Sequence, residues 1–72
     1  MITVLGFNGP DQVSKAEFVL ASSAANFVNA LRSAFNISQI AVMDYKNGQR
    51  TNYDRNGKNW KITMAKLDVV RT

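Results

Sequence analysis

The first third of the chain has the hydrophobic pattern of a β-hairpin. Residues Ile2 to Phe7 are mostly apolar or β-branched, which is typical of a central strand that is covered on both faces. The following segment, Asn8-Gly9-Pro10-Asp11, is a turn signal, because glycine tolerates a positive φ and proline restricts its own φ. Apolar and polar side chains then alternate from Val13 to Ala21. We therefore predict a second, half-buried strand and a hairpin loop of about five residues.

An amphipathic helix is predicted next. Its first turn can be capped by Ser22 or Ser23, and Asn36 can end it in the left-handed conformation. The residues that recur at the spacing of one helical face are Ala24, Phe27, Val28, Leu31 and Phe35.

A single helix over residues 15–35 is the alternative interpretation of this region. Ser14 and Glu17 have the spacing of a capping box, which would start such a helix. Phe18 would then point away from the apolar face, and two serines would lie in mid-helix, where serine is a modest helix former. We therefore favour a strand followed by a helix.

The second half of the chain predicts a three-stranded antiparallel meander. Two Asn-Gly pairs, Asn47-Gly48 and Asn56-Gly57, separate alternating segments, and this is the strongest short-range hairpin signal. As two-residue type I′ turns they define strands over about 38–46, 49–55 and 58–69. The sequence thus predicts a single small α+β domain over residues 1–72, in the order ββαβββ, with the helix packed on one sheet face.

Two-residue turns also fix the register, and the register fixes which side chains share a face. They place Tyr45 opposite Arg50, and Tyr53 opposite Trp60. The face expected under the helix carries Ile40, Val42, Thr51, Tyr53, Trp60, Ile62 and Met64. The open face carries Ala41, Met43, Tyr45, Arg50, Asn52, Asp54, Asn59, Lys61 and Thr63. The alternation changes phase after Met64, so a β-bulge is expected near Ala65-Lys66.

Charge is distributed unevenly along the chain, whose formal net charge is +4. Residues 1–45 carry two basic against three acidic side chains, a net charge of −1, whereas residues 46–72 carry seven against two, a net charge of +5. Such asymmetry is typical of a surface that faces a polyanion. Lysine and arginine also keep a β-rich segment soluble and protect its edges, so charge alone does not decide the function.

The composition argues against an enzyme. The chain contains no histidine and no cysteine, which removes the commonest general base, the thiolate nucleophile and most ligands of transition metals. Asp44 and Asp54 are predicted to project from opposite faces, and no acidic pair has the spacing of a magnesium motif. We expect a non-enzymatic protein without a cofactor or metal. The sequence shows neither a signal peptide nor a membrane span, so a cytoplasmic protein is expected.

The open face of the meander combines the side-chain types that bind nucleic acids. Arginine and asparagine can read base edges, tyrosine can stack on an unpaired base, and cations can hold phosphates. The layout is similar in shape to DNA-binding modules that combine a three-stranded sheet with a helix, such as the arm-binding domains of some integrases. We therefore predict DNA or RNA as the partner, bound by Tyr45, Lys46, Arg50, Asn52, Arg55, Lys58 and Lys61.

Protein binding is the alternative function. Met43 and Tyr45 would be exposed on the open face, and the last strand, with Leu67, Val69 and Val70, is a candidate free edge. A core of this size without a disulfide favours self-association, so a homodimer through an edge strand is expected. Small basic chains of this kind also resemble phage or mobile-element accessory proteins that bind and inhibit a host factor.

Overall fold

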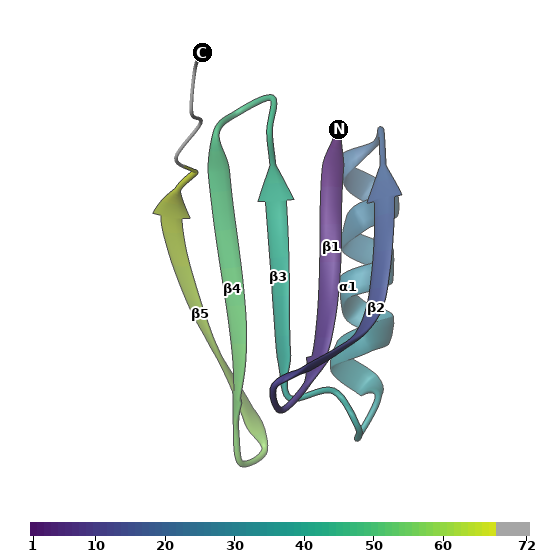
Figure 1. Ribbon diagram of the computed structural model, residues 1–72, viewed down its shortest axis with the longest axis vertical. Helices are drawn as coiled ribbons and strands as arrows, with labels where there is room; N and C mark the ends of the chain where they lie inside the picture. The colour runs from purple at the N-terminus through teal and green to yellow at the C-terminus, as the bar shows by residue number, and fades with distance from the viewer. Residues whose placement is uncertain (68–72) are drawn as a thin grey trace.

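A five-stranded antiparallel sheet packs against one helix in the computed structural model, which describes residues 1–67 (Figure 1). The strands lie side by side in the order β2-β1-β3-β4-β5, so β3 is central, β1 is an inner strand, and β2 and β5 are the two edges. This architecture confirms the predicted α+β class and the order ββαβββ. The elements are β1 (Ile2–Asn8), β2 (Asp11–Phe18), α1 (Ala21–Ser33), β3 (Gln39–Asp44), β4 (Gln49–Asn56) and β5 (Asn59–Lys66).

The hydrophobic core lies between α1 and the three strands β2, β1 and β3. Val4 and Ile40 are the largest side chains that are fully buried, and Ala24 and Val28 reach them from the helix. Gly6 allows the helix to approach β1 closely, because a Cβ atom there would lie 3.3 Å from Cδ1 of Leu31. Within the described residues, no helix is long and apolar enough to cross a membrane.

The helix covers only three of the five strands. It packs on β1, β2 and β3, and Figure 1 shows β4 and β5 extending beyond it. Ile62 and Met64 lie on the helix-side face as predicted, but they are 53% and 63% exposed because α1 does not reach them. The expectation that the helix packs on the meander is therefore correct only for β3, since β1 and β2 continue the sheet on the other side of that strand.

The first hairpin is tighter than predicted. Asn8 pairs with Asp11, so Gly9 and Pro10 form a two-residue loop, and β2 begins two residues before Val13. Gly9 has a φ of 62° and its N–H donates to the Ser38 side chain. The strand-then-helix interpretation is confirmed, and the single helix over residues 15–35 is wrong.

Both ends of α1 differ from the prediction. The N-cap residue is Leu20, and no side chain caps the first turn, so the predicted serine caps are wrong. The helix ends at Ser33, and Asn36 does not adopt a positive φ. Phe35 consequently lies beyond the helix, where it is 94% exposed instead of joining the apolar stripe.

The β3–β4 loop has four residues, from Tyr45 to Gly48, in place of the predicted two-residue turn. Met43 therefore lies opposite Arg50, and the predicted pairing of Tyr45 with Arg50 is wrong. The reason lies in Asp44, whose carboxylate accepts hydrogen bonds from the backbone N–H and the side-chain amide of Asn47. Aspartate stabilises such a turn by bonding the backbone ahead of it.

The β4–β5 turn consists of Gly57 and Lys58, one residue later than predicted. Only Gly57 has a positive φ, 66°, which is the pattern of a type II′ turn and not of type I′. Tyr53 lies opposite Ile62, and Trp60 lies opposite Arg55, so the predicted Tyr53–Trp60 pair is wrong.

The predicted faces are nevertheless correct for the residues that lie in the strands, although Tyr45 lies in the loop and not on the open face. Both turns move each residue's partner by two positions, and a shift by two leaves a side chain on the same side of the pleat. The β4–β5 register runs without interruption to Lys66, so the β-bulge expected near Ala65-Lys66 is wrong; the irregularity lies instead between Gly6 and Phe7. The edge residues Val69 and Val70 lie outside the described part of the chain.

Candidate nucleic-acid interface

Strands β4 and β5 form a two-stranded wing, residues 49–66, that extends past the helix. The wing contains five basic residues against Asp54 as its one acidic residue, and Lys46 lies in the loop that precedes it. Those six cations and one anion give residues 46–66 a net charge of +5, while residues 1–45 have −1. The basic part of the sequence is therefore the same part that has no helix over it.

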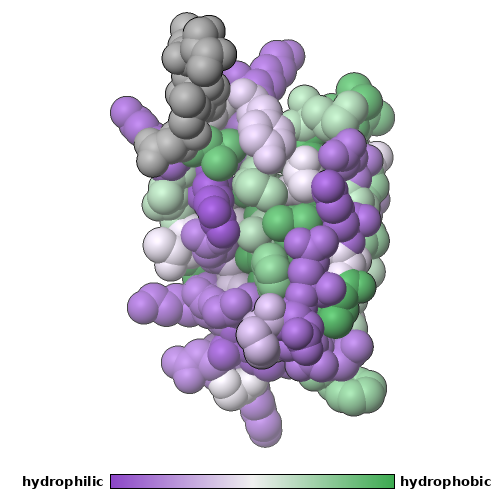
Figure 2. All heavy atoms as spheres, in the orientation of Figure 1, coloured by the Kyte–Doolittle hydropathy of each residue, from purple (hydrophilic) through white to green (hydrophobic). Residues whose placement is uncertain are grey.

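The open face of the wing, which points away from α1, carries the centre of the predicted site. Its residues are Arg50, Asn52, Asp54, Asn56, Asn59, Lys61, Thr63 and Ala65. Figure 2 shows this side of the molecule, with hydrophilic side chains over β4 and β5 on the left and a hydrophobic strip down the middle of the sheet. The structure thus brings together Arg50, Asn52 and Lys61, as the sequence predicted.

Arg50 and Asn52 are joined directly. Nε of Arg50 donates a hydrogen bond of 2.9 Å to Oδ1 of Asn52, two residues along β4. Within the described residues this bond uses Nε alone, which leaves the terminal NH₂ groups of an exposed guanidinium to donate to a ligand. The bond holds the guanidinium along the strand and so reduces the conformational freedom that binding would otherwise remove.

A shallow hollow of about 390 Å³ adjoins this pair on the open face. It is lined by Phe7, Gln39, Ile40, Ala41, Arg50, Asn52, Tyr53, Asp54 and Thr63. Lys61 lies opposite Asp54 in the β4–β5 register, so an acidic side chain stands beside one of the cations of the face. The hollow is consequently of mixed charge, and it is less basic than the wing as a whole.

Two further cations of the predicted site, Lys46 and Lys58, lie at opposite ends of the wing. Tyr45 and Lys46 lie in the β3–β4 loop, where the Tyr45 hydroxyl donates to Sδ of Met43 at 3.6 Å. Lys58 lies in the turn at the opposite end. Eight extended residues span about 26 Å, so Lys46 and Lys58 can contact widely separated points of a long ligand.

Arg55 is separated from the rest of the predicted site. It lies on the helix-side face, where its Nε donates to the carbonyl of Ile37 at 2.9 Å and its Nη2 to that of Ala34 at 2.8 Å. A longer bond of 3.4 Å reaches the carbonyl of Arg32. These carbonyls lie at or just beyond the C-terminal end of α1, where helical carbonyls lack an intrahelical partner. Arg55 therefore ties the wing to the helix.

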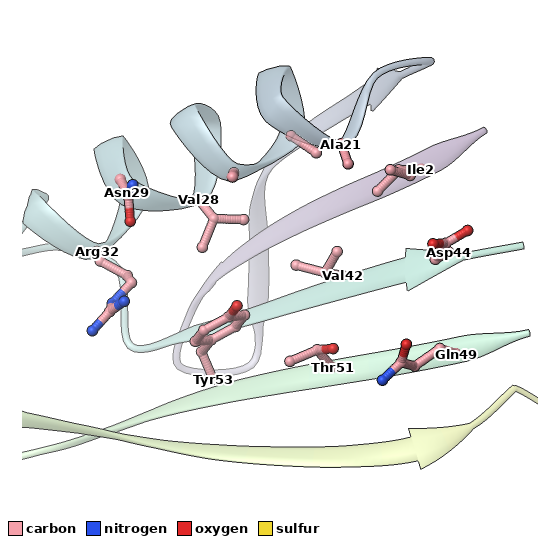
Figure 3. Close-up of a pocket in the computed structure, with 12 residues that line it drawn as sticks. Ile2, Ala21, Val28, Asn29, Arg32, Val42, Asp44, Gln49, Thr51 and Tyr53 are labelled. Atoms are coloured by element: carbon pink, nitrogen blue, oxygen red, sulfur yellow. The ribbon is translucent and has the colours of Figure 1, made fainter. Parts of the chain in front are cut away.

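Sequence reasoning missed a groove on the helix side. It has a volume of about 250 Å³ and lies between α1 and strands β3 and β4, with Val28 and Val42 facing each other across it (Figure 3). Arg32 closes one end, with its guanidinium carbon 5.8 Å from the centre of the Tyr53 ring. No sequence pattern marks this groove, because it exists only where the helix stops short of the wing.

Within the described residues, no group of three acidic side chains could hold a metal ion. The pKa of Asp44 is lowered, chiefly by the hydrogen bond from the Asn47 side chain, and this carboxylate is part of a turn. No protein-family model, curated protein or solved structure matches the chain.

Proposed function

We propose that this protein is a non-enzymatic DNA-binding protein that contacts duplex DNA through the open face of its β4–β5 wing. The proposal rests on one observation, which is that the basic residues are concentrated in the strands that the helix leaves uncovered. Residues 46–66 hold a net charge of +5, and strands β4 and β5 are the two strands that α1 leaves uncovered. A basic, two-stranded ribbon has the dimensions that the major groove of B-form DNA admits.

The side chains of the open face favour a duplex over a single strand. Single-stranded nucleic acids are held largely by stacking of bases on aromatic rings. The open face of the wing carries no aromatic residue, since Tyr53 and Trp60 lie on the helix-side face and Tyr45 lies in a loop. Double-stranded RNA is a poorer fit, because its major groove is too deep and narrow for side chains to read.

Each residue of the site has a separate role in this proposal. Arg50 and Asn52, joined by their hydrogen bond, are placed to contact base edges, because arginine pairs with guanine and asparagine with adenine. Lys61 lies on the neighbouring strand, about 13 Å along from Arg50, and contacts a phosphate. Lys46 and Lys58 at the ends of the wing contact flanking phosphates, which adds affinity without sequence preference. A DNA-binding role is consistent with the cytoplasmic location expected from the sequence.

The experiment is a salt series of fluorescence anisotropy measurements with labelled duplex DNA. Arg50→Ala and Lys61→Ala should each weaken binding. Lys61→Ala should also reduce the slope of log K against log salt concentration by about 1, because Lys61 contacts a phosphate, whereas Arg50→Ala should relax the sequence preference. Lys15→Ala is the matched control, because Lys15 is an exposed cation on β2, outside the wing, and its loss should change neither quantity. Absence of binding by the wild-type protein at low salt, or equal losses for all three variants, would refute the proposal.

Binding to another protein is a second candidate function, favoured by one observation. Ile62 and Met64 are large apolar side chains that are more than half exposed on the helix-side face of β5. The two functions can be distinguished by chromatography at low salt with and without nuclease treatment. A DNA-binding protein should lose co-purifying nucleic acid after nuclease treatment, whereas a protein complex should keep its mass.

A further inference from the structure

Within the described residues, 1–67, β5 is an outer strand of the sheet, and no strand pairs with its far edge (Figure 1). Among its eight residues only Trp60 is partly buried, and the other seven are exposed. The opposite edge, β2, is less suitable for pairing, because its register is interrupted between Gly6 and Phe7 of the adjacent β1 and α1 covers its helix-side face. An unprotected edge strand is a template for a further strand.

The backbone groups that β5 offers can be assigned from its pairing with β4. The N–H of Leu67 donates to the carbonyl of Gly48 at 2.9 Å across the wing. Hydrogen-bonding direction alternates along an antiparallel strand, so the odd-numbered residues of β5 bond to β4. The N–H and C=O groups of Trp60, Ile62, Met64 and Lys66 therefore point to the free edge.

The side chains of β5 are arranged symmetrically about Thr63. If a second copy pairs antiparallel to β5 with a two-fold axis at Thr63, Ile62 of each copy lies opposite Met64 of the other. Both side chains are on the helix-side face, where they are now 53% and 63% exposed. An apolar cross-strand pair of this kind is stabilising.

The charges of β5 select the same register. About Thr63, Lys61 lies opposite Ala65 of the second copy, and Lys66 lies opposite Trp60. A two-fold axis at Lys61 would place that lysine opposite its own copy, and an axis at Ile62 would place Lys66 opposite Lys58. Like charges directly opposite each other are destabilising. An axis at Met64 would pair Lys66 with Ile62, so Thr63 is the centre that pairs apolar with apolar residues and separates the cations.

Backbone geometry is compatible with this centre. Thr63 bonds to β4, so its pair with Thr63 of the second copy is a non-hydrogen-bonded pair, while the Ile62–Met64 pairs exchange two hydrogen bonds each. We propose that two copies of this chain join their sheets through antiparallel pairing of β5 about Thr63. This dimer goes beyond the proposed DNA-binding function and does not depend on it, since no residue of the pairing needs a nucleic acid.

Single cysteine substitutions test the register directly. The chain has no cysteine of its own, so any disulfide formed by a variant with one cysteine joins two copies. In Thr63→Cys the two Cα atoms would lie about 4.5 Å apart, a distance that a disulfide can span. We expect Thr63→Cys to form a covalent dimer in a glutathione redox buffer, as seen by non-reducing electrophoresis.

The controls use the same strand and face. Asn59→Cys should form no covalent dimer under the same conditions, because the two copies of residue 59 would lie about 27 Å apart along the strands. An equal mixture of Lys61→Cys and Ala65→Cys should cross-link more than either variant alone, because these two positions are opposite each other. Equal cross-linking at positions 59 and 63, or none at position 63, would overturn the proposal.

Light scattering provides a test without cysteine. The mass of the wild-type protein should rise from 8.0 kDa towards twice that value with concentration, in high salt and after nuclease treatment. Met64→Lys should abolish the rise and keep its circular dichroism spectrum, because Met64 is 63% exposed and contributes little to the core. Val13→Lys replaces a similarly exposed residue on the other edge strand, and this variant should keep the rise in mass. A wild-type protein that stays monomeric at every concentration would contradict the dimer.

Discussion

The guanidinium of Arg55 lies 4.5 Å from the centre of the Trp60 ring, directly across the β4–β5 ladder. The same guanidinium donates hydrogen bonds to carbonyls at and beyond the C-terminal end of α1. One side chain thus contacts the helix, the connection to β3 and the outermost strand. A positive charge at this end of a helix also interacts favourably with the helix dipole. Arg55 therefore ties the wing to the end of α1, in addition to the β3–β4 pairing, although α1 does not pack on the wing.

Replacement of Arg55 should destabilise the fold. Arg55→Met keeps the aliphatic stem but leaves partly buried carbonyls without a donor, and the free energy of unfolding should fall by about 2 kcal/mol. Arg55→Lys should recover only part of this loss, because an ammonium cannot reproduce the planar fork of donors. Urea denaturation followed by circular dichroism gives both values. Arg50→Met, on the exposed face of the same strand, is the control and should cost less than about 0.5 kcal/mol.

Two valines of the first hairpin should respond very differently to truncation. Val4 is fully buried, whereas Val13 is 50% exposed on the neighbouring strand. Val4→Ala removes two buried carbon atoms and leaves a cavity, so it should lower the free energy of unfolding by about 2 kcal/mol. Val13→Ala should lower the free energy of unfolding by well under about 1 kcal/mol. Both variants lose the same β propensity, so the difference between them reports burial. Similar losses of stability for the two variants in thermal melting would contradict the burial of Val4 in the core.

Removal of the acidic side chain from the open face should strengthen DNA binding. Asp54 lies opposite Lys61 and lines the same hollow as Arg50, so its charge repels a phosphate that approaches these cations. Asp54→Asn should tighten binding a few-fold at low salt, and the gain should decrease as salt screens the charge. Asp11→Asn makes the same charge change in the first hairpin and should have a smaller effect in the same anisotropy assay. Weaker binding by Asp54→Asn would count against the proposed face.

The β3–β4 loop should be sensitive to acid. The hydrogen bond from the Asn47 side chain holds the pKa of Asp44 below its ordinary value. A carboxyl group with a lowered pKa stabilises the fold above its unfolded-state pKa, and this contribution is lost as the pH falls through the folded-state pKa. A titration of the Asp44 carboxyl carbon by NMR should therefore have a midpoint below that of an unperturbed aspartate. Asn47→Ala should raise the midpoint, and an unchanged midpoint would mean that the side-chain bond does not set it.

The hydrophobic pattern predicted the elements and their faces but not their exact registers. The alternation around Tyr53 and Trp60 was sufficient to place both side chains on one face, because a partner shift of two positions does not change the face. The turns themselves were ambiguous. Gly57 fits the second position of a type I′ turn or the first position of a type II′ turn. The chain adopts the type II′ turn. The bond between Asp44 and Asn47 similarly favoured a four-residue β3–β4 loop over the predicted two-residue turn.

The sequence by itself determined the strands, the helix and the separation of apolar from polar faces, since these depend on local spacing along the chain. It also predicted that Arg50, Asn52 and Lys61 share the open face. Only the tertiary structure decided which strands the helix covers, because β1 lies beside β3 through a contact between residues far apart in the sequence. That placement exposes the basic wing and leaves β5 as an edge. It also separates Arg55 from the predicted site, since the carbonyls that it binds meet β4 only when the chain has folded.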